Sequence, residues 1–120
     1  MNGRLKNEYG NVLIDKSVLA EYAGYAAMET LGVVGMAVNN VKDGAMKILK
    51  RENAGQGISV EIVDNRIKLT IHIIVAYGVN IKAVAQNLLD NVKGRLEANT
   101  GLEVEYITII IDGVKNIDVV

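Results

Sequence analysis

The sequence predicts an α+β domain in which a mixed β-sheet, built around a central hairpin, carries two main helices on one face. Two observations support this prediction. From Ile58 to Tyr77 apolar and polar residues alternate with a period of two, which is typical of strands with one buried face. After Gly78 the period lengthens to about 3.6 residues, as in an amphipathic helix, and another alternating run begins near Val104. The 120 residues fit a single domain, 1–120, with its own core.

The N-terminal third predicts a short strand, a helix and a second short strand. Residues 1–10 read as a polar lead-in, and the strand covers 12–14. Asp15 can cap a helix over 16–31, and small residues along it allow close packing on the sheet. A β-rich run at 33–38 follows. The apolar positions of this helix are Val18, Leu19, Tyr22, Ala23, Ala26 and Leu31.

The segment from Asn39 to Gly57 has the least regular pattern. Within it, residues 43–52 predict a short extra helix. We expect this segment to be the most mobile part of the domain, because it combines polar residues with several glycines.

The central hairpin is the best-defined element. Asp64 and Asn65 tolerate positive φ and can form a two-residue turn. If Val63 pairs with Arg66, the apolar rows of the two strands face each other, and a slip by one residue would turn one row into solvent. These rows are Ile58, Val60 and Ile62 on the first strand, and Ile67, Leu69, Ile71, Ile73, Val75 and Tyr77 on the second.

The second main helix begins after Asn80, which can cap it, and ends at Thr100-Gly101. Its apolar stripe is Ile81, Val84, Ala85, Leu88, Val92 and Leu96. Because short turns join strand, helix and strand, we expect a right-handed crossover to a parallel strand. Asp112-Gly113 is a turn signal, after which the chain either adds an edge strand or stays loose.

Composition narrows the classes of function. The chain has no cysteine, which removes thiolate chemistry and fits a reducing cytosol. The formal net charge of −1 gives no global attraction to nucleic acid or anionic lipid. Phe and Trp are missing as well, so only five tyrosines could stack on bases, and we expect no nucleic-acid partner. Neither a signal peptide nor a membrane span is visible, so we expect a cytoplasmic protein.

Residue patterns indicate no catalysis, cofactor or metal. His72 is the only histidine, and no carboxylate or cysteine motif accompanies it in the sequence, so an exposed strand residue is the better interpretation. The stretches Gly32-x-x-Gly35 and Gly55-Gln56-Gly57 lack the spacing of phosphate-binding loops. We therefore expect a protein that is not an enzyme.

Apolar residues outside the predicted core indicate a binding surface. Ile74 and Ile110 lie on the nominally polar face of the sheet, and Leu89 lies beside the main helix stripe. Either the middle segment covers them or they contact another molecule. On the second reading, Ile74, Leu89 and Ile110 are interaction residues.

A basic cluster offers another candidate surface. Lys47, Lys50 and Arg51 would share one face of the predicted short helix and could bind an anion. Asp43 and Glu52 dilute this charge, so a solvated face is the default interpretation.

The order of short motifs resembles the alkaline shock protein family of Gram-positive bacteria, also called the Gls-type envelope stress response family, in its short single-domain form. The matching motifs, which span nearly the whole chain, include Gly10–Ile14, Ala23–Ala27, Gly32–Gly35, Gly57–Ile62, Tyr77–Ile81, Asn91–Lys93 and Thr100–Val104. Lys82 stands where the family often has proline, and Leu89 where it often has glutamine, which strengthens the case for an apolar surface at Leu89.

This resemblance implies a non-catalytic cytoplasmic protein in envelope homeostasis that forms a homo-oligomer and binds a membrane-anchored or metabolic protein. Membrane association would then come through the partner. The alternative is a regulatory domain for an acyl or phosphorylated metabolite, with the face of Lys47, Lys50 and Arg51 near its opening.

Overall fold

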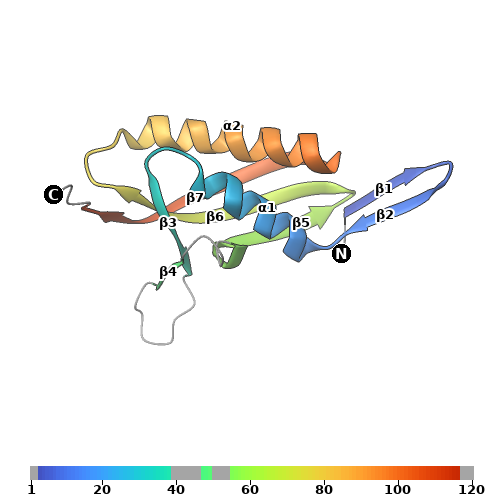
Figure 1. Cartoon of the computed structure of the whole chain (residues 1–120), viewed down its shortest axis with the longest axis horizontal. Helices are drawn as coiled ribbons and strands as arrows, with labels where there is room; N and C mark the ends of the chain where they lie inside the picture. Colours follow the sequence, from blue (N-terminus) through green and yellow to red (C-terminus); the bar gives the residue numbers. More distant parts are fainter. Residues whose placement is uncertain (1–2, 39–46, 50–54, 117–120) are drawn as a thin grey trace.

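The computed structural model describes residues 3–38, 47–49 and 55–116, and it confirms an α+β fold. A two-stranded hairpin precedes a five-stranded sheet that carries two helices (Figure 1). The elements are β1 (Gly3–Asn7), β2 (Gly10–Ile14), α1 (Lys16–Met28), β3 (Val33–Val38), β4 (Lys47–Leu49), β5 (Ile58–Val63), β6 (Arg66–Ala76), α2 (Ile81–Thr100) and β7 (Glu103–Lys115).

Strand β6 is the centre of the larger sheet. On one side it pairs antiparallel with β5 over 66–71 and with β3 over 73–75, and β4 pairs with the outer side of β3. On its other side β6 pairs in parallel with β7 along its whole length. Among the described residues β7 is therefore an edge strand, with no strand paired along its other side.

The hairpin register and the parallel pairing across α2 are confirmed. Val63 faces Arg66 and Ile58 faces Ile71, which is the predicted register. Asp64 and Asn65 have φ values of 51° and 63°, as a two-residue turn between twisted strands requires. The parallel pairing of β6 and β7 across α2 matches the predicted crossover.

The main core lies between the sheet and both helices. The apolar row of β6, from Ile67 to Val75, forms one buried cluster with side chains from α1 and α2. The predicted α2 stripe supplies Val84, Leu88, Val92 and Leu96. Asn80 Oδ1 accepts a hydrogen bond from the Ala83 N–H (3.1 Å). Gly101 ends the helix in the left-handed conformation, with φ 75°, so both predicted helix ends are confirmed.

Half of the predicted apolar positions of α1 are buried. Leu19, Ala23 and Ala26 pack into the core, as predicted, and their small neighbours let the helix approach the sheet closely. Val18 and Tyr22 were wrong, because they are 43% and 44% exposed. Leu31 is 89% exposed and lies beyond the end of the helix at Met28.

The start of α1 is capped less directly than predicted. Asp15 occupies the cap position, but its side chain makes no capping bond to the helix backbone. It accepts a hydrogen bond from the Ser17 hydroxyl instead (2.6 Å), and this bond lowers the pKa of Asp15.

Three further expectations need correction. The predicted polar lead-in contains β1, which pairs with β2. The predicted extra helix over 43–52 is wrong at 47–49, where β4 pairs with β3; its other residues lie outside the described part of the chain. Asp112-Gly113 is not a turn, because β7 continues to Lys115 and absorbs Asp112 in a register shift.

The hairpin of β1 and β2 extends beyond the sheet and is held by the turn of the central hairpin (Figure 1). The Arg4 N–H donates to Asn65 Oδ1, and Asn65 Nδ2 donates to the Arg4 carbonyl, both at 2.8 Å. Leu5 packs against the main core. The side chain of Asn65 thus takes the place of a neighbouring strand.

Candidate interaction surfaces

The structure gives His72 a partner that the sequence analysis missed. Nδ1 of His72 lies 2.7 Å from Oδ2 of Asp112, and both side chains are largely buried. In the parallel register His72 faces Ile110, so Asp112 lies on the same face of β7, just beyond it. The predicted crossover could have revealed this pair, had the register of β7 been extended through the supposed turn.

This histidine and carboxylate link β6 to β7. In the described ranges, no three His, Cys, Asp or Glu side chains gather closely enough to hold a metal ion. Every buried side-chain nitrogen or oxygen in this part of the chain has a hydrogen-bond partner.

The predicted interaction residues differ in their exposure to solvent. Ile74 is only 1% exposed, so its place on an open surface was wrong. In the sheet it pairs with Gly35 on one side and Gly113 on the other. Ile110, at 37% exposed, remains accessible on the outer face of β7, and Leu89 is half-buried on a flank of α2.

The predicted anion patch loses its geometric basis. Lys47 lies in strand β4, so it does not belong to a helix that would place it on one face with Lys50 and Arg51. Lys50 and Arg51 lie outside the described residues.

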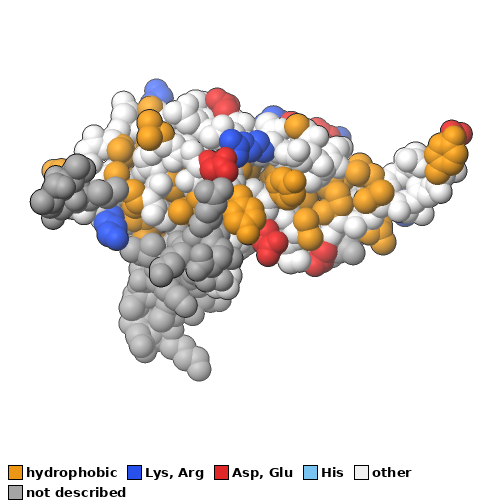
Figure 2. Space-filling model, viewed as in Figure 1, with side chains coloured by type: hydrophobic (Ala, Val, Ile, Leu, Met, Phe, Trp, Pro, Cys, Tyr) orange, Lys and Arg blue, Asp and Glu red, His pale blue; other side chains and the backbone are white. Residues whose placement is uncertain are grey.

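A groove between α1 and α2 was not predicted. It has a volume of about 690 Å³, and Figure 2 shows apolar side chains gathered on this side of the molecule, over α1 and toward the β1–β2 hairpin. An ion pair between Glu29 and Arg95 crosses from one helix to the other. The groove is lined by Val18, Glu21, Tyr22, Tyr25, Ala26, Glu29, Arg95 and Asn99.

The groove was missed because Val18 and Tyr22 were assigned to the buried side of α1. Tyr22 and Tyr25 are three residues apart and share a flank of the helix, next to the buried side that carries Leu19 and Ala23. Large aromatic side chains beside a run of small residues were the available signal.

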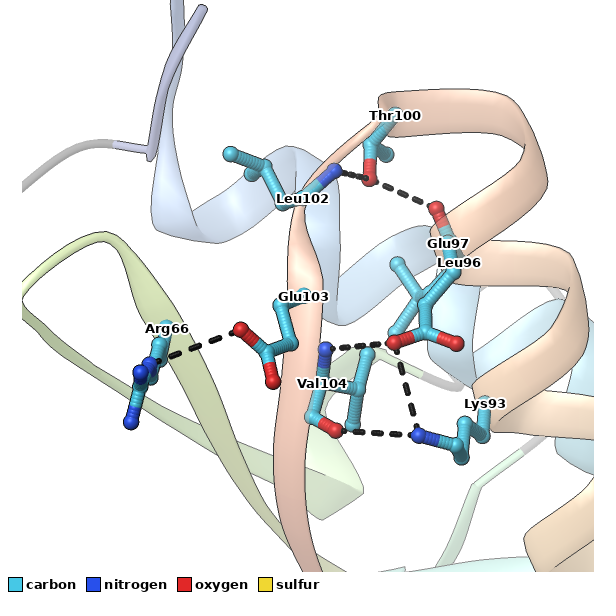
Figure 3. Close-up of polar contacts among 8 residues, drawn as sticks. All are labelled: Arg66, Lys93, Leu96, Glu97, Thr100, Leu102, Glu103 and Val104. Atoms are coloured by element: carbon cyan, nitrogen blue, oxygen red, sulfur yellow. Dashed lines mark hydrogen bonds and ion pairs between the residues drawn. The ribbon is translucent and has the colours of Figure 1, made fainter.

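The free edge of β7 is the second candidate surface, and α2 covers one end of it (Figure 3). Glu97 Oε2 accepts a hydrogen bond from the Val104 N–H at 3.0 Å, and Lys93 Nζ donates to the Val104 carbonyl at 3.3 Å. Lys93 and Glu97 also form an ion pair at 3.4 Å. Two side chains of one helix therefore occupy the backbone groups that an added strand would need at Val104.

Sequence comparison places this fold in a family. The model of the alkaline shock protein 23 family, which is the alkaline shock protein family and is described as having a cell envelope-related function, matches residues 4–116. The chain belongs to this family. The family that the order of motifs indicated is therefore confirmed, together with its link to the cell envelope.

Three bacterial relatives match most of the chain. The uncharacterized protein YloU of Bacillus subtilis is 38% identical over 96% of this chain and 97% of its own length. The uncharacterized protein Spy1614 of Streptococcus pyogenes is 30% identical, with 96% of each chain covered. A second Bacillus subtilis relative, YqhY, is 32% identical over 88% of this chain and 78% of its own. The comparison with solved structures gave no significant match.

The described residues contain no helix that is both long and apolar enough to span a lipid bilayer.

Proposed function

We propose that this protein is a non-catalytic interaction module of cell-envelope homeostasis, which acts in the cytoplasm, self-associates and binds a membrane-anchored or metabolic protein. The observation that carries this proposal is the row of half-exposed apolar side chains on α1, namely Val18, Tyr22 and Tyr25. Tyrosine is common at protein interfaces, because its ring packs on apolar groups while its hydroxyl stays hydrated.

The shape of this surface fits a helical partner. Two packed helices form the walls of the groove, and one of them presents large side chains at a three- and four-residue spacing. An amphipathic helix can lay its apolar face into such a groove and use the same spacing for its own anchors. The charged group of Glu21 at the groove favours a partner helix that carries basic residues beside its apolar face.

A capture experiment tests the proposal. The tagged protein is incubated with the membrane and soluble fractions of a Gram-positive lysate, in parallel with the variants Tyr22→Ser and Tyr9→Ser. Tyr9 is 91% exposed on the β1–β2 hairpin, away from the groove, and serves as the matched control. We expect Tyr22→Ser to lose the captured protein and Tyr9→Ser to retain it. Equal capture by both variants would contradict a binding role for the groove.

The groove also supports the second candidate, a regulatory domain for a small metabolite. Its volume of about 690 Å³ lies within the range of ligand sites. The lining favours an acyl chain over a phosphorylated compound, because Arg95 is the only cation among the described residues that line it, and it pairs with Glu29. A thermal-shift screen with fatty acids and sugar phosphates distinguishes the two ligand classes. A rise in Tm that disappears in Tyr22→Ser would favour this function.

A further inference from the structure

The outer edge of β7 carries backbone groups whose direction can be worked out. In an extended strand, residues with side chains on the same face point their N–H and C=O groups toward the same edge. The side chain of Val104 is buried toward the helices, and its backbone groups point outward to Lys93 and Glu97. Ile107, Ile109 and Ile111 also pack on the helix side, so their N–H and C=O groups point to the same free edge.

The central hairpin leads to the same result. A two-residue turn makes Val63 and Arg66 a hydrogen-bonded pair, so alternate residues of β6 point toward β5 and the others, including Leu69 and Ile71, point toward β7. Leu69 and Ile71 are the partners of Ile107 and Ile109 in the parallel ladder. In such a ladder only one residue of each facing pair directs its groups between the strands. Ile107 and Ile109 therefore point away from β6.

No hydrogen bond from another described residue reaches the outward groups of Ile107, Ile109 or Ile111. A long apolar edge of this kind is a template for another strand. These three residues are placed symmetrically about Ile109, which is also the midpoint of β7.

We propose that two copies of this chain pair through their β7 edges, antiparallel, about a two-fold axis at Ile109. The proposal rests on the self-association included in the proposed function and names its surface. Ile109 then faces Ile109 of the second copy, and Ile107 faces Ile111. Each of these is a hydrogen-bonded pair, in which the two residues exchange both backbone bonds. The two sheets become one continuous sheet, with all helices on the same face.

The residues around Ile109 suit a second copy as the occupant of this edge. Strand β7 pairs with β6 without a register shift from Tyr106 to Ile111, between the shifts at Glu105 and Asp112. None of these six residues is charged, so the two-fold pairing places no like charges opposite one another. Glu103 lies outside the interface, beyond Val104, and forms an ion pair with Arg66 of β6 at 3.4 Å. The edge is thus complementary to itself, which a two-fold interface requires.

The flank of α2 explains where this pairing stops and why Leu89 is apolar. Lys93 and Glu97 occupy the edge at Val104, so an added strand begins beyond it. From Val104 to Ile107 the ladder advances by only two residues of β6, from Ile67 to Leu69, because of the register shift at Glu105. This advance of about 7 Å is slightly more than one turn of helix, and Leu89 lies one turn from Lys93, so it comes beside Ile107. Leu89 and Ala85, one turn further on, replace the polar pair along the open part of the edge and can contact the second copy.

Cysteine cross-linking tests the register directly, since the chain has no cysteine of its own. Thr108 would face Ile110 of the second copy in a pair without hydrogen bonds, where Cα atoms are about 4.5 Å apart and a disulfide can form. Thr108→Cys protein is mixed with Ile110→Cys protein and oxidised. We expect about tenfold more cross-linked dimer in the mixture than in either variant alone, since self-pairs at these positions lie out of register. A mixture of Ser59→Cys and Ile110→Cys is the matched control, because Ser59 lies on the same sheet face but on β5, away from the β7 edge.

Molar mass from light scattering over a concentration series completes the test. Wild-type protein should reach twice the chain mass, and Ile109→Pro should remain a monomer with an unchanged circular dichroism spectrum. The N–H that proline removes points to the free edge, so the bonds between β6 and β7 are kept. If Ile109→Pro fails to fold, the cysteine experiment alone decides.

Two results would overturn the inference in distinguishable ways. A wild-type dimer whose Thr108/Ile110 mixture cross-links no better than the Ser59 control would refute pairing through β7 and leave self-association standing. A monomer at every concentration would remove self-association from the proposed function as well, while capture of a partner by the groove would be unaffected.

Discussion

Two glycines of this chain have opposite effects on its stability. Gly78 has φ 91° in the connection between β6 and α2, a conformation that side chains with a Cβ rarely adopt. Gly94 lies within α2, exposed, with open space where a Cβ would be. The first glycine is required by the backbone, whereas the second weakens the helix.

Alanine at these two positions should therefore change stability in opposite directions. Gly78→Ala should lower the free energy of unfolding by about 1 kcal/mol, because nothing crowds its Cβ but the backbone is strained. Gly94→Ala should raise it by about 0.5 to 1 kcal/mol through helix propensity. Urea denaturation of both variants measures this difference, and a shift of the same sign in both would refute the assignment.

Ile74 and Ile110, which the sequence pattern placed on the same face of the sheet, differ in burial. Ile74→Glu should destabilise the protein by about 3 kcal/mol or more, because its carboxylate would be buried without a partner. Ile110→Glu should cost the folded monomer about 1 kcal/mol or less, since this side chain already reaches solvent. Thermal denaturation at low protein concentration compares them. A folded and stable Ile74→Glu variant would show that Ile74 is accessible after all.

Helices and strands were predicted correctly where neighbouring residues determine them, and were missed where contacts with distant residues do. The register of β5 and β6 follows from two alternating rows and a two-residue turn, all within neighbouring residues. The caps of α2 are likewise local. By contrast, β1 has a mostly polar sequence and is held by the side chain of Asn65, a contact 61 residues away that no local pattern indicates. Strand β7 continues through the Asp112-Gly113 turn signal, because its pairing with β6 extends to Lys115.

The attachment of the N-terminal hairpin to the sheet should depend on one side chain. Asn65→Gly keeps a good turn residue but removes both hydrogen bonds to Arg4, so the Arg4 amide should exchange with solvent about fivefold faster, for a loss of about 1 kcal/mol. Asp64→Gly improves the same turn and leaves those bonds in place. Hydrogen exchange followed by NMR compares the two variants. Equal protection of Arg4 in both would mean that Leu5 packing alone holds the hairpin.

At the scale of the whole molecule, helix α2 separates the two candidate surfaces. One flank carries Asn91 and Arg95, which contact Thr30 and Glu29 beside the groove. The opposite flank carries Lys93 and Glu97, which contact β7. The sequence indicated only Leu89 and Ile110 near the β7 edge. It missed the groove because the spacing of apolar residues along α1 does not reveal that Val18 and Tyr22 stay half-exposed beside the buried side of the helix.

This separation predicts that the two associations are independent. Tyr22→Ser should abolish partner capture and leave the molar mass unchanged, whereas Ile109→Pro should halve the mass and leave capture intact. Light scattering and the capture assay, applied to both variants, measure this. Loss of both properties in either folded variant would mean that the partner binds across the two copies.

The central position of β6 also has a consequence for folding during synthesis. Because synthesis runs from the N-terminus, β6 emerges from the ribosome well before β7, with all of α2 made in between. During that interval one whole side of β6 has no neighbour, and the parallel pair can form only by closing a long loop, which is slow. The sheet therefore becomes complete only after translation has passed Lys115. Until then the nascent chain exposes the unpaired edge of β6, which is prone to aggregation and which a chaperone could shield.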